Sequence, residues 1–300
     1  MKEVYLSTGA FRTRSLDDIV FHCLRHDIRH LELSSGLDPV DLKTVGHRLE
    51  TLAPCLVHNY FPPPATPFVL NLAADEKPAL AASLALCHQA IDLCAALDAP
   101  FYSVHGGFVA DLTPQQLGDA DAQAVLALGI DTDAYERAFD RFCESMATLS
   151  TYACATGVRL LVENNVQARR PIGTRHLLMV TAEDFERFFA RLNDRNLGVL
   201  VDVGHLIVSG KTCDFMPSEF CLRLAHRIEA FHLSENDGWA DQNLPVRANS
   251  WFWPIVRHFP EATLVLEAYG LSISQMLEQR DLVAGILHPE RHQLHAINHG

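Results

Sequence analysis

The chain has 300 residues, of which 48% are hydrophobic, and its 24 Lys and Arg against 37 Asp and Glu give a formal net charge of −13. This balance excludes a disordered chain, and it argues against broad electrostatic binding to nucleic acid or to an anionic membrane, which needs clustered Lys and Arg. Sixteen His are unusual in so acidic a chain and single out histidine as the residue type to follow.

Short apolar segments alternate with longer amphipathic segments along the chain. The apolar segments predict eight β-strands, at Val4–Ser7, His30–Leu33, Leu52–His58, Phe101–His105, Arg159–Glu163, Leu197–Asp202, Ile228–Leu233 and Thr263–Glu267. The amphipathic segments predict helices that include Leu16–His26, Pro78–Ala96, Ala134–Thr156, Ala182–Leu192, Ser218–Arg227 and Ser272–Leu287.

The alternation of strand and helix predicts a parallel sheet. Eight such units, with no dividing linker rich in Gly, Pro or Ser, favour a single (β/α)8 barrel domain over residues 1–300, with a His-rich tail at about 288–300. The chain lacks a Gly-rich nucleotide-binding sequence, which argues against a doubly wound sheet. Four long irregular segments follow strand ends, at Asn59–Asp75, Gly106–Asp133, Asn164–Val180 and Ser234–Ser250. A barrel places such loops on its C-terminal face, where active sites form.

Eight Cys without a Cys-x-x-Cys pair are typical of reduced thiols in a cytosolic protein and argue against thiolate ligands for zinc. The N-terminal sequence lacks the apolar run of a signal peptide. No stretch comes close to the roughly 20 apolar residues that cross a bilayer. We therefore expect a cytoplasmic protein without a membrane segment.

Six consecutive predicted strands end in an ionisable residue, and these residues are His58, His105, Glu163, Asp202, His232 and Glu267. Each residue alone is well explained as a hydrogen-bonded or ion-paired loop residue. Together, however, they converge at the barrel mouth, where several carboxylates repel one another unless a cation neutralises them. The pattern therefore predicts a divalent metal site. Imidazole and carboxylate ligands without thiolate favour zinc, manganese, cobalt or iron over calcium.

From LELSSG in the second unit to LVLEAYG in the last, and above all in LVDVGH and FHLSENDG, the chain resembles the xylose-isomerase-like TIM-barrel superfamily. This superfamily contains sugar isomerases and epimerases and the metal-dependent apurinic-site endonucleases. The resemblance implies a shared metal site formed by Glu163, Asp202, His232 and Glu267.

In the endonuclease branch, the resemblance adds His58 and His105 at a second metal, and His205 with an Asp-x-His pair at a third. Here that pair reads Asp241-Gln242-Asn243, so the third site lacks one imidazole. The missing ligand and the acidic charge favour the isomerase branch over a nuclease that acts on damaged DNA.

We therefore expect a metal-dependent isomerase or epimerase of a sugar or sugar phosphate, which transfers a proton through a metal-stabilised enediolate. Glu163 and Glu267 supply the pair of carboxylates, and His205 donates to a substrate hydroxyl. A related lyase or dehydratase, which expels a β-hydroxyl from the same enediolate, is a further alternative. A non-catalytic barrel is the weakest reading, because the ligands are present.

The sequence leaves two possible roles open for several residues near the predicted site. His58 and His105 either bind a second metal with Glu163 or contact the substrate. Tyr60 and Phe61 precede three prolines and form an apolar wall over the site or pack on the barrel rim.

Basic residues follow three of the strands and either bind an anionic substrate group or are ordinary surface charges; they are Arg169, Arg170, Arg175, Lys211 and Arg247. The expected partner is a small-molecule sugar. The His-rich tail is a candidate contact in a homo-oligomer.

Overall fold

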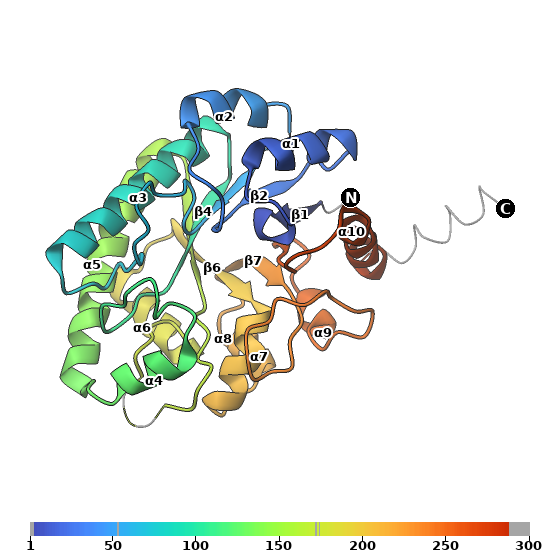
Figure 1. Ribbon diagram of the computed structural model, residues 1–300. Coiled ribbons are helices and arrows are strands. Elements are labelled where there is room, and N and C mark those ends of the chain that lie inside the picture. The colour runs from blue at the N-terminus through green and yellow to red at the C-terminus, as the bar shows by residue number, and fades with distance from the viewer. Residues whose placement is uncertain (1–2, 53, 172, 174, 288–300) are drawn as a thin grey trace.

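Eight parallel strands close into a barrel in the order β1 to β8. Figure 1 shows the helices arranged around the strands. The strands are β1 (Val4–Ser7), β2 (Leu31–Leu33), β3 (Leu56–His58), β4 (Phe101–His105), β5 (Arg159–Glu163), β6 (Leu197–Asp202), β7 (Ile228–Leu233) and β8 (Thr263–Leu266). Pairing of Val4 with Leu264 and of Leu6 with Leu266 closes the ring. The computed structural model describes residues 3–287 except 53, 172 and 174, so the expected tail at 288–300 lies outside the described residues. The predicted (β/α)8 barrel is confirmed.

Helices surround the barrel and lie between successive strands. They are α1 (Leu16–Arg25), α2 (Leu42–Leu49), α3 (Lys77–Ala96), α4 (Ala120–Ala127), α5 (Thr132–Thr156), α6 (Ala182–Leu192), α7 (Val203–Thr212), α8 (Pro217–Arg223), α9 (Trp253–Val256) and α10 (Ile273–Leu287). Local sequence sets several of their ends. Thr181 caps α6 in a capping box with Asp184, and Gly157, with a φ of +77°, ends α5.

The barrel interior holds one small apolar layer, formed by Leu56, Phe101, Leu161, Leu200, Ala230 and Val265. Because side chains alternate along a strand, the residue two positions further on points to the same interior. Leu161 and Glu163 are related in this way, and so are Leu200 and Asp202. The period of two therefore places the ionisable strand ends directly above the apolar layer.

Several predicted boundaries differ from the structure. The strand expected from Leu52 begins only at Leu56, because Pro54 interrupts the apolar run, and Leu52 and Cys55 are buried outside the sheet. The segment Gly106–Asp133, expected to be irregular, contains α4 and the first residues of α5.

Sequence reasoning also missed α2, α7 and α9, and the remaining differences are shifts at element ends. The largest of these shifts is in α8, which ends at Arg223 rather than Arg227.

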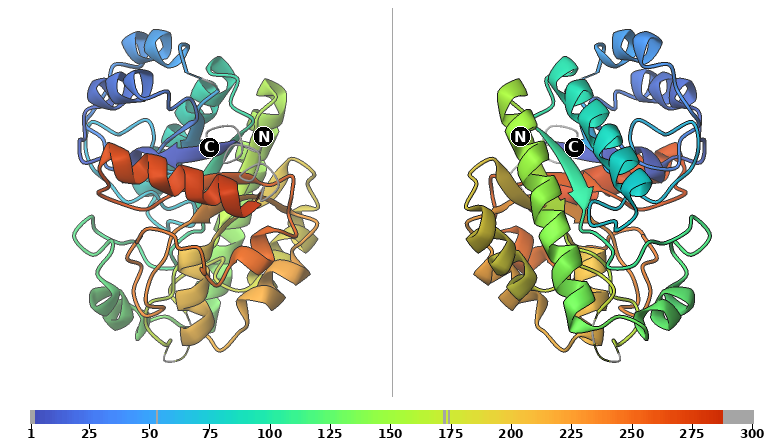
Figure 2. Two further views of the ribbon diagram at one scale, coloured as in Figure 1. Left: turned by 90° about the vertical axis from the view of Figure 1, so that its right-hand side faces the viewer. Right: turned by 90° about the vertical axis from the view of Figure 1, so that its left-hand side faces the viewer.

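Helix α3 overturns one further expectation. It has 20 residues and is long and apolar enough to cross a membrane by composition alone, contrary to the prediction that no stretch comes close to this length. In the structure α3 packs on α5, β3 and β4, and Figure 2 shows α3 and α5 side by side on the outside of the barrel. A barrel helix has this composition because one face is buried by the sheet and a second face by its neighbour.

Candidate metal and catalytic site

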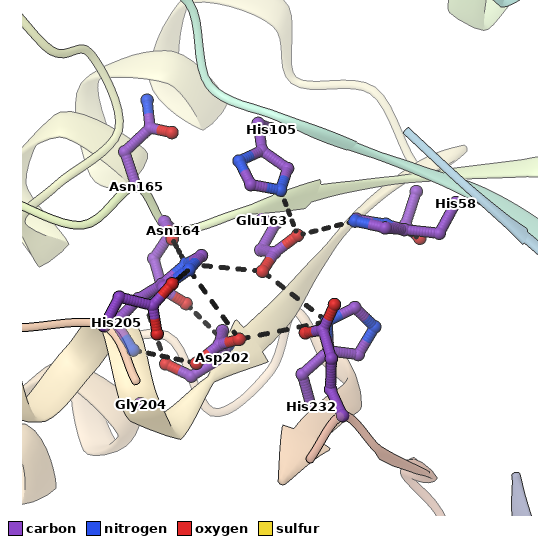
Figure 3. A network of polar contacts seen from close by, with 12 residues as sticks. His58, His105, Glu163, Asn164, Asn165, Asp202, Gly204, His205 and His232 are labelled. Atoms are coloured by element: carbon purple, nitrogen blue, oxygen red, sulfur yellow. Dashed lines mark hydrogen bonds and ion pairs between the residues drawn. The ribbon is translucent and has the colours of Figure 1, made fainter. Parts of the chain in front are cut away.

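Four side chains from the ends of neighbouring strands meet at one point. Glu163, Asp202, His232 and Glu267 each offer one ligand atom, and these atoms all lie within 4.8 Å of one another. Nδ1 of His232 lies 2.8 Å from Oε2 of Glu267, 3.5 Å from Oε1 of Glu163 and 3.9 Å from Oδ2 of Asp202. Figure 3 shows this network. The structure thus brings together the four residues predicted for the shared metal site.

His58 and His105 approach the same glutamate from its other side. Their Nε2 atoms lie 3.3 and 3.1 Å from Oε2 of Glu163. Dashed lines in Figure 3 mark both contacts. His58, His105 and Glu163 form a second group of three candidate ligands. Nδ1 of His58 is 2.9 Å from the Ser103 hydroxyl, which fixes the orientation of the ring. Glu163 therefore has one carboxylate oxygen facing each group.

His205 lies in the first turn of α7, not in an open turn as the sequence suggested. Its Nδ1 is 2.8 Å from the backbone oxygen of Asn164, and its Nε2 is 3.3 Å from Oδ2 of Asp241. Asn243 lies nearby, and its backbone oxygen accepts a hydrogen bond from the backbone N–H of Tyr269. Among the described residues, three overlapping ligand groups are present, the third formed by Glu32, His58 and His232, and Asp241 belongs to none of them.

The motif around Asp202 folds this way for local reasons. Oδ1 of Asp202 accepts from the backbone N–H of His205 and so caps α7 directly at the end of β6. The Asn164 side chain accepts from the backbone N–H of Asp202 at 2.8 Å and donates to its oxygen at 3.1 Å. A Cβ at Gly204 would lie 2.6 Å from the Ser234 hydroxyl, so only glycine fits there. These contacts fix the ends of β5, β6 and β7 relative to one another.

The buried ionisable groups of the cluster shift one another's pKa values. Burial raises the pKa of Asp202 well above its ordinary value, with Glu163 and Glu267 adding to the rise. Burial also acts to raise the pKa of Glu163 and of Glu267, but the facing histidines outweigh it. The pKa of Glu163 therefore falls well below its ordinary value, and that of Glu267 falls to about 2. Burial lowers the pKa of His58 to about 3. These shifts show carboxylates and imidazoles that face one another at close range and interact strongly.

The residues fit a divalent cation. Although they are fully buried, both carboxylate oxygens of Glu163, Oδ2 of Asp202 and Nδ1 of His232 have no hydrogen-bond partner within the described part of the chain. Buried polar atoms are nearly always paired. Three of these four atoms face the shared cluster and Oε2 of Glu163 faces His58 and His105, so both groups suit a bound ligand. Three carboxylates and one imidazole form a donor set suited to zinc, manganese, cobalt or iron.

Sequence reasoning missed Glu32 on β2. Its Oε2 lies 2.9 Å from Nε2 of His232, on the far side of the ring from the cluster, and both side chains are fully buried. A carboxylate in this position fixes the tautomer and orientation of an imidazole ligand. The position of this glutamate within the apolar run Leu31-Glu32-Leu33 could have indicated that it has a buried partner, because a buried charge without a partner is costly.

A cavity of about 680 Å³ opens above the cluster, and its lining includes His58, His105, His205, Glu267 and Tyr269. Tyr269, a second residue that sequence reasoning missed, donates its hydroxyl to Oε1 of Glu267 at 3.1 Å.

The residues predicted to bind substrate occupy different places. Tyr60 lines the cavity, whereas Phe61 is fully buried in the core. Lys211 and Arg247 are not among the described residues that line it.

Three further arginines pair with aspartates, in the ion pairs Arg169–Asp121, Arg170–Asp214 and Arg175–Asp184.

Residues 23–261 match the family of xylose isomerase-like TIM barrels, and the chain belongs to this family, as its sequence motifs predicted. No curated protein matches the sequence significantly.

Solved structures share the fold at low sequence identity. A D-tagatose 3-epimerase-like protein is 18% identical, with 98% of this chain and 100% of that chain covered and a TM-score of 0.72. An L-ribulose 3-epimerase is 14% identical, with 99% and 98% covered and a TM-score of 0.68. A protein of Thermus thermophilus, soaked with zinc chloride, is 20% identical, with 94% and 98% covered and a TM-score of 0.60.

Proposed function

We propose that this protein is a metal-dependent sugar isomerase or epimerase that moves a proton at a carbon next to a carbonyl group. The observation that carries the proposal is the convergence of three carboxylates and one imidazole, within 4.8 Å of one another, beside a cavity of about 680 Å³. The epimerases among the similar structures support the choice of reaction.

Glu163, Asp202, His232 and Glu267 would hold the cation, and His58 and His105 would share Glu163 with a second one. A bound divalent metal supplies Lewis-acid polarisation of a carbonyl oxygen.

Side chains of the cluster would carry out the proton transfer. Glu267 lines the cavity, and as a ligand of the cation it would be ionised at neutral pH. The Tyr269 hydroxyl occupies Oε1 and orients the carboxylate. Glu267 is therefore placed to accept the proton from the substrate carbon, and Glu163, fully buried across the cluster, is the second carboxylate of the pair. His205 donates from Nε2 to a substrate hydroxyl.

The cavity lining favours this reaction over cleavage of damaged DNA. Arg14 is the only Arg or Lys among the described lining residues, and much of the wall is apolar, with Pro63, Pro64 and Phe68. A DNA backbone needs several cationic contacts, because each phosphate carries a charge. The second ligand group, at His58 and His105, is compatible with a nuclease as well as with an isomerase.

The proposed proton transfer is tested by exchange of the carbon-bound hydrogen of a ketose with deuterium from the solvent. The protein, loaded with Mn²⁺ or Co²⁺, is incubated with a panel of ketoses in deuterium oxide, and deuterium next to the carbonyl is measured by NMR. We expect exchange in the wild type and a loss of at least about 100-fold in Glu163→Gln and in Glu267→Gln. Glu229→Gln is the matched control, because Glu229 lies on β7 but pairs with Arg159 away from the cluster.

Retained exchange in either cluster variant would remove the two-carboxylate mechanism. Rapid, EDTA-sensitive cleavage of a duplex with an abasic site would replace the proposal with the nuclease reading.

A further inference from the structure

A second cavity of about 690 Å³ adjoins the first. The two share five lining residues, which are Leu117, Gly118, Gln123, Val166 and Asp241. Asp241 is also 3.3 Å from His205, so the boundary between the cavities lies beside the candidate site. Each cavity alone falls within the roughly 300–1,000 Å³ that typically encloses a small organic ligand. Together they offer more room than one sugar ring needs.

Trp239, on the loop after β7, lines the second cavity with its side chain 62% exposed. The segment that carries the indole is held by nearby contacts. Nζ of Lys211 lies 4.9 Å from the ring centroid and donates to the Asp237 backbone oxygen, while the backbone N–H of Trp239 donates to the Asp237 side chain. Gly238 has a φ of +78°, and a Cβ there would collide with Lys211. An exposed indole offers an aromatic face on which the C–H groups of a sugar ring can stack.

The polar groups of this cavity suit hydroxyls and disfavour an anion. Its described lining holds three carboxylates, from Asp119, Asp121 and Asp241, against the single guanidinium of Arg169. That guanidinium is already paired, with its Nε 2.8 Å from Oδ1 of Asp121. Among the described lining residues, a phosphate would face three carboxylates and no unpaired cation, and it would be repelled. Neutral hydroxyls can donate to these carboxylates and accept from the guanidinium N–H groups that the ion pair leaves available.

We propose that the second cavity binds the second, uncharged sugar ring of a glycoside whose ketose end occupies the first cavity. This inference rests on the proposed function and specifies its substrate class as a glycosylated sugar rather than a sugar phosphate. Trp239 stacks on the outer ring, and Asp121 and Arg169 bind its hydroxyls.

The experiment measures binding and turnover separately. Calorimetry on the metal-loaded protein compares D-fructose with four glucosyl-fructoses that differ in the linked oxygen of the ketose: turanose, maltulose, leucrose and palatinose. We expect at least one disaccharide to bind tenfold or more tightly than fructose. In Trp239→Ala that gain disappears while fructose affinity stays within twofold, and Trp239→Phe keeps part of it. Phe21→Ala is the control, because Phe21 is a comparably exposed aromatic side chain, 57% exposed on α1 and outside both described linings.

The proposal is overturned if no disaccharide binds more tightly than fructose, or if Trp239→Ala retains the full gain. Deuterium exchange, measured on the same samples, separates this proposal from the function it rests on. Exchange into fructose without any preference for a disaccharide refutes the second-ring site alone. A Trp239-dependent preference without exchange into any of the five sugars supports the site and refutes the isomerase mechanism.

Discussion

Replacing Glu32 by alanine tests how the metal site is held. Glu32 is not one of the four residues proposed to hold the cation, but its carboxylate accepts from Nε2 of His232 at 2.9 Å. Nδ1 of the same ring faces Glu163, Asp202 and Glu267. The substitution leaves the Nε2–H of a fully buried ring unpaired and frees the ring to turn. We therefore expect a weaker metal site in a protein that still folds.

The magnitude follows from these contacts. An unsatisfied buried donor costs about 1–3 kcal/mol, which sets the expected loss of folding stability. Loss of the carboxylate that orients a histidine ligand weakens metal binding by about 10- to 100-fold. Glu32→Gln keeps an acceptor oxygen but loses the charge, so we expect it to lie between the wild type and Glu32→Ala.

Competition of Zn²⁺ and Co²⁺ between the protein and a chelator measures affinity, and circular dichroism and urea unfolding of the metal-free protein measure folding. Glu229→Gln is again the control, since it changes a carboxylate on β7 without contact with His232. A folded Glu32→Ala protein with wild-type metal affinity would refute the positioning argument. Absence of metal binding in the wild type would instead refute the proposed function.

Two further predictions concern stability. Burial lowers the pKa of His176 from 6.5 to about 4, so between these pH values the unfolded chain binds a proton that the folded chain does not, and stability falls as the pH falls. This contribution of His176 to the pH dependence of the unfolding free energy amounts to about 3 kcal/mol at most. Urea unfolding at pH 7 and pH 4 should show that His176→Gln loses less unfolding free energy than the wild type over this range. Equal losses in the two proteins would contradict the role given to His176. Asp184 is buried, pairs with Arg175, and accepts from the Tyr135 hydroxyl and the Val180 N–H. Asp184→Ala should cost about 3–5 kcal/mol of unfolding free energy, and a loss below about 1 kcal/mol would mean that the pair contributes little.

Strand positions and the candidate ligands were predictable because both depend on local patterns. Apolar runs marked most strands to within one residue, and the polar residue that ends each run identified Glu163, Asp202 and His232. The predicted element boundaries were wrong where a second local signal acts against the apolar pattern. Pro54 delays the start of β3, and a helix follows β6 without any intervening loop, because Asp202 is both the last residue of the strand and the cap of α7.

The sequence by itself determined the alternation of strands and helices, and with it a barrel whose ionisable strand ends share one face, because a period of two and parallel closure leave no other place for them. Tertiary structure alone decided which groups meet. It paired His232 with Glu32 from 200 residues away, turned Phe61 into the core while Tyr60 faces the cavity, and left Lys211 and Arg247 outside that cavity's described lining. It also set Trp239 beside α4 at a second cavity. These contacts join residues far apart in the chain, and their geometry depends on loop conformation and packing, which local periodicity does not encode.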